Sequence, residues 1–190
     1  MLEIACAQIK AWENDERSRD LIIAVNVSAR QFHQADFVEH INRVLAASGA
    51  NPARLKLELT ESVVLENVAD TISNMAAIKQ LGVSFAMDDF GTGYSSLAYL
   101  AQLPLDQLKI EQSFVRNLTG NRNNETITRI IIILGQGLAM EVIAEGVETE
   151  AQREFLEAHG CQAFQGYLFS RPLPIEELEI FLLRDTGVAS

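Results

Sequence analysis

The sequence has little cysteine, few aromatic residues, and no apolar stretch long enough to cross a membrane. Its two cysteines, Cys6 and Cys161, lie far apart and outside any metal-ligand spacing, which argues against a disulfide framework or a cysteine metal site. The longest apolar run, Ile130–Leu134, falls far short of the roughly 18 residues of a membrane helix, and we expect a deeply buried helix there. The start, Met1-Leu2-Glu3, lacks the basic residues of a signal peptide. We therefore expect a cytoplasmic protein.

Positive charge is also scarce. The chain has 15 Lys and Arg residues against 26 Asp and Glu residues, a net charge of −11. Because polymeric nucleic acid and anionic membranes repel such a chain, we expect neither as a partner. An anionic small substrate remains possible where a divalent cation reverses the local field.

The residues that are present suit one α/β domain. The chain has 190 residues, of which 48% are hydrophobic, and no Gly/Ser/Pro-rich linker divides it. Short apolar strands alternate with amphipathic helices, several of which end at a glycine such as Gly49 or Gly82. This alternation predicts a parallel sheet covered by helices, followed by a last helix and a frayed tail over 175–190. The predicted strands are Leu21–Val27, Leu55–Leu59, Val83–Met87, Gln107–Ile110, Glu141–Ala144 and Ala163–Phe169.

Each predicted strand ends at a polar residue. In order, these residues are Asn26, Glu58, the pair Asp88 and Asp89, Lys109, Glu145 and Gln165. In a parallel barrel such ends converge on one rim, where barrel enzymes build their active sites. Carboxylate and amide oxygens are hard ligands for Mg²⁺, Mn²⁺ or Ca²⁺, and two adjacent aspartates could hold two ions. Two ions beside a lysine suit the attack of metal-activated water on a phosphodiester.

Six sequence blocks resemble those of the EAL-domain cyclic di-GMP phosphodiesterases. They are Asn26–Phe32 (NVSARQF), Leu57–Ser62 (LELTES), Met87–Leu97 (MDDFGTGYSSL), Leu108–Ile110 (LKI), Ile143–Glu148 (IAEGVE) and Gln165–Pro172 (QGYLFSRP). The resemblance runs from the first helix to about Pro174. It implies a (β/α)8 TIM-like barrel, possible attachment to sensory domains, and metal-dependent hydrolysis of cyclic di-GMP to linear pGpG.

The resemblance also implies roles for the residues at the strand ends, with Mg²⁺ or Mn²⁺ as the cofactor and two ions in the intact site. The implied metal ligands are Asn26, Glu58, Asp88, Asp89 and Glu145. The implied catalytic residues are Lys109, Asp89 and Glu145, of which Lys109 would assist the attacking water. The implied supporting or substrate-binding residues are Gln165, Glu148, Gly91, Thr92 and Gly93.

Each role has a plainer alternative. Lys109 could be a structural partner of Glu145 or Asp89, and Glu148 could be an acid that interacts with a helix dipole. Two other functions also stay open. The chain could be a non-catalytic cyclic di-GMP receptor or dimerisation module, or a different Mg²⁺ barrel enzyme in which Lys109 is a general base on a carbon acid.

The sequence lacks the Glu-Ala-Leu motif that names the family. Six predicted strands stand where eight are expected, so we expect the first two strands and the helix between them to be missing by truncation, and activity to be impaired. An opened barrel exposes the edges of Leu21–Val27 and Ala163–Phe169. We therefore expect a homodimer or larger oligomer in which a second copy covers the open side. The alternative is a family-type dimer through the helices that follow Asp88-Asp89 and Lys109.

Overall fold

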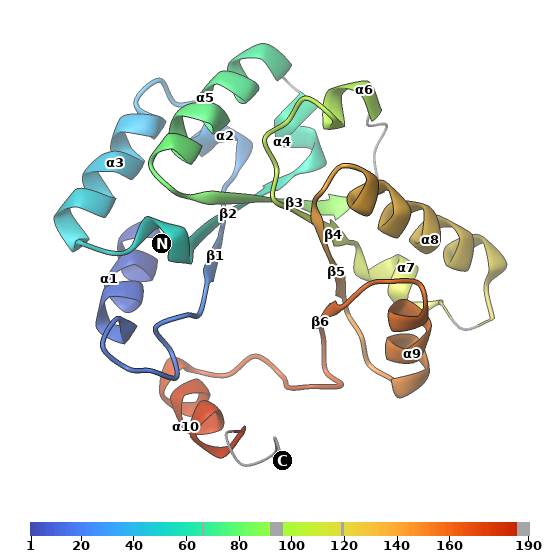
Figure 1. Cartoon of the computed structure of the whole chain (residues 1–190). Coiled ribbons are helices and arrows are strands. Elements are labelled where there is room, and N and C mark those ends of the chain that lie inside the picture. The colour runs from blue at the N-terminus through green and yellow to red at the C-terminus, as the bar shows by residue number, and fades with distance from the viewer. Residues whose placement is uncertain (66, 92–96, 119, 186–190) are drawn as a thin grey trace.

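Six parallel strands form one sheet that curls into a half-barrel, with helices on its outer, convex side (Figure 1). The computed structural model describes residues 1–65, 67–91, 97–118 and 120–185. The strands follow one another in the sheet in sequence order, as the alternating pattern predicts. They are β1 (Ile23–Asn26), β2 (Leu55–Thr60), β3 (Ser84–Phe90), β4 (Gln107–Ile110), β5 (Glu141–Glu145) and β6 (Ala163–Gln165).

Helices precede β1, connect the successive strands and follow β6. They are α1 (Leu2–Trp12), α2 (Ala29–Phe32), α3 (Phe37–Ser48), the 3-10 helix η1 (Pro52–Arg54), α4 (Glu61–Leu65), α5 (Val68–Gln80), α6 (Leu97–Leu100), α7 (Gln112–Arg116), α8 (Arg122–Gly137), α9 (Glu150–Ala158) and α10 (Ile175–Asp185). Gly49 adopts the left-handed conformation at the end of α3, with φ 64°, as predicted. Thr149 and Gln152 form a capping box at the start of α9, as their spacing predicts.

The two faces of the sheet differ in chemistry because side chains alternate along each strand. On β2, Leu55, Leu57 and Leu59 are fully buried and belong to the core shared with the helices. Lys56 and Glu58 alternate with them and point to the concave side. The concave face therefore carries polar groups, and its upper rim is the carboxyl end of the strands.

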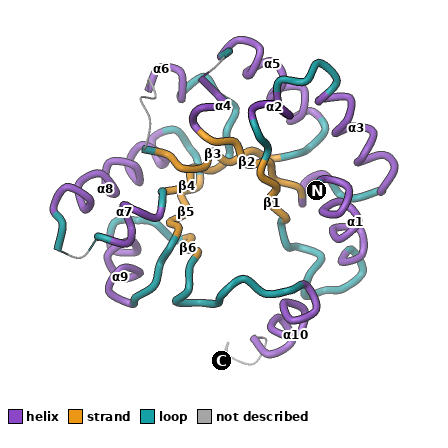
Figure 2. Tube along the Cα trace, turned by 180° about the vertical axis from the view of Figure 1, so that it is seen from behind, coloured by secondary structure: helices purple, strands orange, loops and turns teal. Residues whose placement is uncertain are grey.

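The half-barrel is open between β1 and β6. Within the described residues, each of these strands pairs with a strand on one side only. Figure 2 shows the chain after β6 running along this opening to α10, which lies beside α1. The indole N–H of Trp12 on α1 donates a hydrogen bond of 2.9 Å to Glu179 on α10.

Two expectations about the elements were wrong. The predicted strand Ala163–Phe169 ends at Gln165, because the chain turns there and the Leu168 N–H donates to the Val147 carbonyl. The run Ile130–Leu134 is not buried all round. Ile131 and Ile132 face the core, whereas Ile130 and Ile133 are 58% and 66% exposed, since the helix has one outward face.

Cys6 and Cys161 are free and buried, in keeping with their role as small apolar side chains. Among the described residues, no helix combines the length and apolar character that crossing a membrane requires.

Candidate metal centre

Lys109 lies at the centre of a group of carboxylates on the concave rim. Its Nζ is 2.9 Å from Glu58, 3.1 Å from Asp88 and 2.8 Å from Glu145. These residues come from β2, β3, β4 and β5, so four neighbouring strands contribute one side chain each. The sequence predicts this convergence, because in a parallel half-barrel all the strand ends meet at one rim.

The lysine is held as a cation although it is buried. Only 5% of Lys109 is exposed, and burial by itself would lower its pKa. Hydrogen bonds to Glu145 and Glu58 outweigh this effect and hold the pKa of Lys109 well above its ordinary value. The structure thus places Lys109 in contact with Glu58, Asp88 and Glu145.

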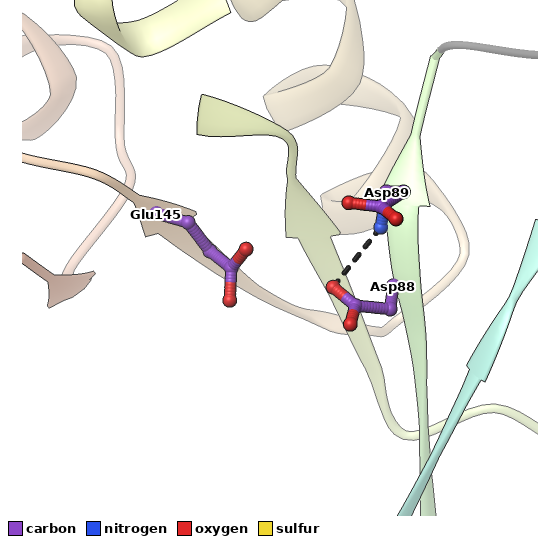
Figure 3. A group of neighbouring side chains, drawn as sticks. All are labelled: Asp88, Asp89 and Glu145. Atoms are coloured by element: carbon purple, nitrogen blue, oxygen red, sulfur yellow. Dashed lines mark hydrogen bonds between the residues drawn. The ribbon is translucent and has the colours of Figure 1, made fainter. Parts of the chain in front are cut away.

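Asp89 joins the group through an irregularity in β3. In a regular strand, Asp88 and Asp89 would point to opposite faces. Here the pairing of β3 with β4 shifts register between Met87 and Phe90, and Asp89 has a positive φ of 55°. The Asp89 N–H donates a hydrogen bond of 3.0 Å to the Asp88 side chain (Figure 3). The two aspartates therefore lie on the same rim.

Gly91 supports this local turn. Its φ of 102° lies in the left-handed region, and an added Cβ would come within 3.0 Å of the Phe114 ring. The supporting role of Gly91 stays a prediction, and Thr92 and Gly93 lie outside the described residues.

Three of the carboxylates have the geometry of a cation site. Asp88 and Asp89 on β3 face Glu145 on β5 across β4 (Figure 3), and one ligand oxygen from each lies within 4.8 Å of the other two. Burial and the neighbouring charges of Asp88 and Glu111 raise the pKa of Asp89. Burial also raises the pKa of Glu145, and the hydrogen bond from Lys109 offsets this only in part. Ionised, these oxygens are the hard donors that a divalent cation prefers, so the residues fit such an ion.

The remaining predicted site residues lie on neighbouring strands. Asn26 ends β1 and pairs in register with Glu58 on β2. Gln165 ends β6 and pairs in register with Glu145 on β5. With Gln112 and Arg116, it lines a cavity of about 250 Å³ that adjoins Glu145.

Glu148 lines the same cavity. Its backbone N–H donates a hydrogen bond of 2.8 Å to Gln152 at the start of α9. The expectation that its side chain anchors the segment after Asp89 remains a prediction, because that segment includes 92–96, outside the described residues.

Sequence reasoning missed a second polar layer beneath the rim. Lys56, Gln107 and Glu141 lie on the same strands as Glu58, Lys109 and Glu145, and two contacts join them. They precede the rim residues by two or four positions, and such a spacing places side chains on the same face of a strand. This spacing could have predicted the second layer.

Comparisons with known proteins agree with this geometry. The profile of the EAL domain family matches residues 1–172. The cyclic di-GMP phosphodiesterase NbdA of Pseudomonas aeruginosa is 42% identical over 182 residues, which are 96% of this chain and 23% of NbdA. The chain spans about a quarter of the length of the curated relatives it matches.

Solved structures give the same family. The phosphodiesterase PaMucR in complex with c-di-GMP has a TM-score of 0.89 and 41% identity, over 93% of this chain and 71% of that one. A manganese/cyclic di-GMP complex of Klebsiella pneumoniae BlrP1 has a TM-score of 0.76 and 29% identity, over 90% of this chain and 44% of that one. The half-barrel has the fold of EAL-type TIM-barrel domains, and the chain belongs to the EAL domain family.

Proposed function

We propose that this domain is a phosphodiesterase that hydrolyses cyclic di-GMP to linear pGpG with the help of Mg²⁺ or Mn²⁺, and that residues 1–190 alone do so slowly or not at all. The observation that carries the proposal is the carboxylate group of Asp88, Asp89 and Glu145, whose ligand oxygens lie within 4.8 Å of one another beside buried Lys109. The relatives support the substrate, because NbdA is named a cyclic di-GMP phosphodiesterase and PaMucR was solved with c-di-GMP.

The proposed metal ligands fall into two groups. Asp88, Asp89 and Glu145 would hold one ion, and Glu58 and Asn26 on the adjoining strands would complete the shell or hold a second ion. Bound there, a divalent cation lowers the pKa of water and neutralises charge on a phosphodiester. Gln165 and Glu148 line the cavity beside Glu145 and would orient the substrate there. Gly91 keeps the turn after Asp89, and Thr92 and Gly93 retain their proposed supporting role.

Lys109 supplies a fixed positive charge. In the metal-free chain its raised pKa keeps it protonated at neutral pH, so it donates hydrogen bonds to the carboxylates around it. A general base needs a pKa near the working pH. The protonated state therefore disfavours a role for Lys109 as a base on a carbon acid and favours the phosphodiesterase.

The open side of the half-barrel determines the expected rate. Within the described residues, β1, which carries Asn26, lacks a second neighbour, so this ligand is held less firmly than those on β2 to β5. Because a two-ion site needs fixed geometry, we expect residues 1–190 alone to turn over cyclic di-GMP slowly or not at all.

Chromatography of pGpG formed with Mn²⁺ or with EDTA tests this, using residues 1–190 and a version extended at the N-terminus. We expect the extended version to be active only with the metal. Full-speed turnover by residues 1–190 would refute the claim of impairment. Activity of the extended version in EDTA would refute the metal dependence, and binding without hydrolysis by that version would indicate a receptor.

We also propose that the chain acts in the cytoplasm as one domain with a C-terminal helix, and that it forms a homodimer through the open side. The segment after β6 and α10 exposes Phe169, Ile180 and Phe181 near the opening, which favours this surface. The exposed Ile133 of α8 marks the alternative, family-type surface.

Light scattering tests the dimer. We expect the wild type to be a dimer, Ile180→Asp to be a monomer, and Ile133→Asp to remain a dimer, since both positions are exposed and neither change disturbs the core. The opposite pattern would move the interface to α8, and a monomeric wild type at micromolar concentration would refute the dimer.

A further inference from the structure

A second polar layer lies beneath the carboxylates of the rim. The side-chain amide of Gln107 donates a hydrogen bond of 2.6 Å to Oε2 of Glu141. Nζ of Lys56 lies 3.9 Å from the same oxygen. Only 6% of Gln107 and 9% of Lys56 are exposed, so both partners of Glu141 are buried. Glu141 thus receives two partners from the concave face, although its own carboxylate is open to solvent.

Lys56, Gln107 and Glu141 form this lower layer. They lie on strands that also carry rim residues. Lys56 precedes Glu58 by two residues on β2, and Gln107 precedes Lys109 by two on β4. Glu141 precedes Glu145 by four residues on β5. Because side chains of a strand alternate with a period of two, each lower residue shares the face of the rim residue above it.

The lower contacts also cross the curve of the sheet. Lys56, which pairs with Glu141, is on β2, three strands away from β5 in the order β2-β3-β4-β5. Ala86 of β3, which pairs in register with both Glu58 and Gln107, has a small side chain that leaves room on the concave face. Lys56, Gln107 and Glu141 therefore connect β2, β4 and β5, three of the four strands that meet at Lys109.

We propose that Gln107 and Glu141, together with Lys56, are positioning residues for the metal centre. Their contacts fix the relative placement of β2, β4 and β5, so that Glu58 and Glu145 both reach Lys109 and a cation. The inference rests on the metal-dependent function proposed above. Metal ligands must be held within about 0.5 Å of their working geometry by the groups behind them, so losing this layer loosens the site.

A neutral substitution tests the geometry without changing charge. We expect Gln107→Met to weaken Mn²⁺ binding about tenfold, the lower end of the range for lost groups behind metal ligands. The affinity is measured by electron paramagnetic resonance of free Mn²⁺, on samples whose folded state is verified by circular dichroism. In the N-terminally extended version, kcat falls while KM for cyclic di-GMP stays unchanged.

The matched control is Gln136→Met. Gln136 is exposed on α8 and donates a hydrogen bond of 3.2 Å to the Gly160 carbonyl, away from the concave face. We expect its Mn²⁺ affinity to equal that of the wild type, because the same chemical change is made outside the lower layer.

A second variant covers the case in which Gln107→Met does not fold. Glu141→Ala removes the shared acceptor at a solvent-exposed carboxylate, and we expect the same tenfold loss. Four residues of strand separate Glu141 from Glu145, about 13 Å, which exceeds the screening length of about 8–10 Å, so its charge has little direct effect.

Wild-type Mn²⁺ affinity in folded Glu141→Ala, or in folded Gln107→Met, overturns the inference while leaving the metal centre intact. A wild type that binds no Mn²⁺ overturns the metal centre itself, together with the inference that depends on it.

Discussion

Replacing Lys109 with methionine is expected to destabilise the EDTA-treated chain by about 3–5 kcal/mol, the usual cost of removing one partner from a buried ionic group. Methionine has a similar length but no charge, so Glu58, Asp88 and Glu145 would face one another without the ammonium group that now lies within 3.1 Å of each. Because folding raises the pKa of Lys109, its contribution is fully present below the unfolded pKa of about 10.4. It is lost only as the pH rises through the folded pKa.

Mn²⁺ is expected to restore much of this stability, because a cation at the same carboxylates replaces the missing charge. At a hundredfold excess over its Kd, a ligand that binds only the folded state stabilises it by about 2.7 kcal/mol. Urea unfolding with and without Mn²⁺ measures both effects.

Lys79→Met is the matched control, since Lys79 pairs with Asp106 outside the rim, 2.5 Å away, in a partly exposed position. We expect it to change stability by about 1 kcal/mol or less and to respond to Mn²⁺ as the wild type does. A Lys109→Met chain as stable as the wild type would show that Lys109 is not the counter-charge of the rim.

The second large effect concerns Asp88. We expect Asp88→Asn to lower the rate of cyclic di-GMP hydrolysis by about 10²–10³, the usual loss when a group that stabilises charge in the transition state is removed. The amide has nearly the shape of the carboxylate, but it lacks the negative charge that holds both Lys109 and a cation. The rate is measured as initial pGpG formation by an N-terminally extended version with Mn²⁺ in excess.

Asp70→Asn makes the same chemical change at an exposed position on α5, where Asp70 accepts a hydrogen bond from Asn67. We expect it to keep the wild-type rate. If Asp88→Asn also kept that rate, the carboxylates of the rim would not carry the chemistry.

Much of the fold follows from the sequence because the pattern is regular. Short apolar strands separated by amphipathic helices leave few options other than a parallel sheet with sequential strand order. The rim residues follow from the same rule, since each strand carries its polar residue at its carboxyl end. The sequence alone therefore predicts that four side chains meet at the rim, those of Glu58, Asp88, Lys109 and Glu145.

The placement of Asp89 could not be predicted in this way. Strict alternation puts it opposite Asp88, and only the register shift and the positive φ at Asp89 return it to the rim. An aspartate tolerates that backbone conformation better than most residues, but its occurrence depends on the pairing of β3 with β4. The sequence alone does not specify that pairing.

The lower layer was missed for a different reason. Lys56 and Glu141 lie near the amino-terminal ends of their strands, where polar residues are commonly solvated. No functional role was therefore predicted for either residue. Their contact spans three steps of the sheet, and only the curvature of the half-barrel brings them within reach.

Calorimetric titration with Mn²⁺ tests most directly whether the rim carboxylates bind a divalent cation. We expect the wild type to bind Mn²⁺ and Asp88→Asn to bind it at least ten times more weakly, because one ligand and one negative charge are lost together. Equal affinities in the two chains would contradict cation binding by the rim carboxylates.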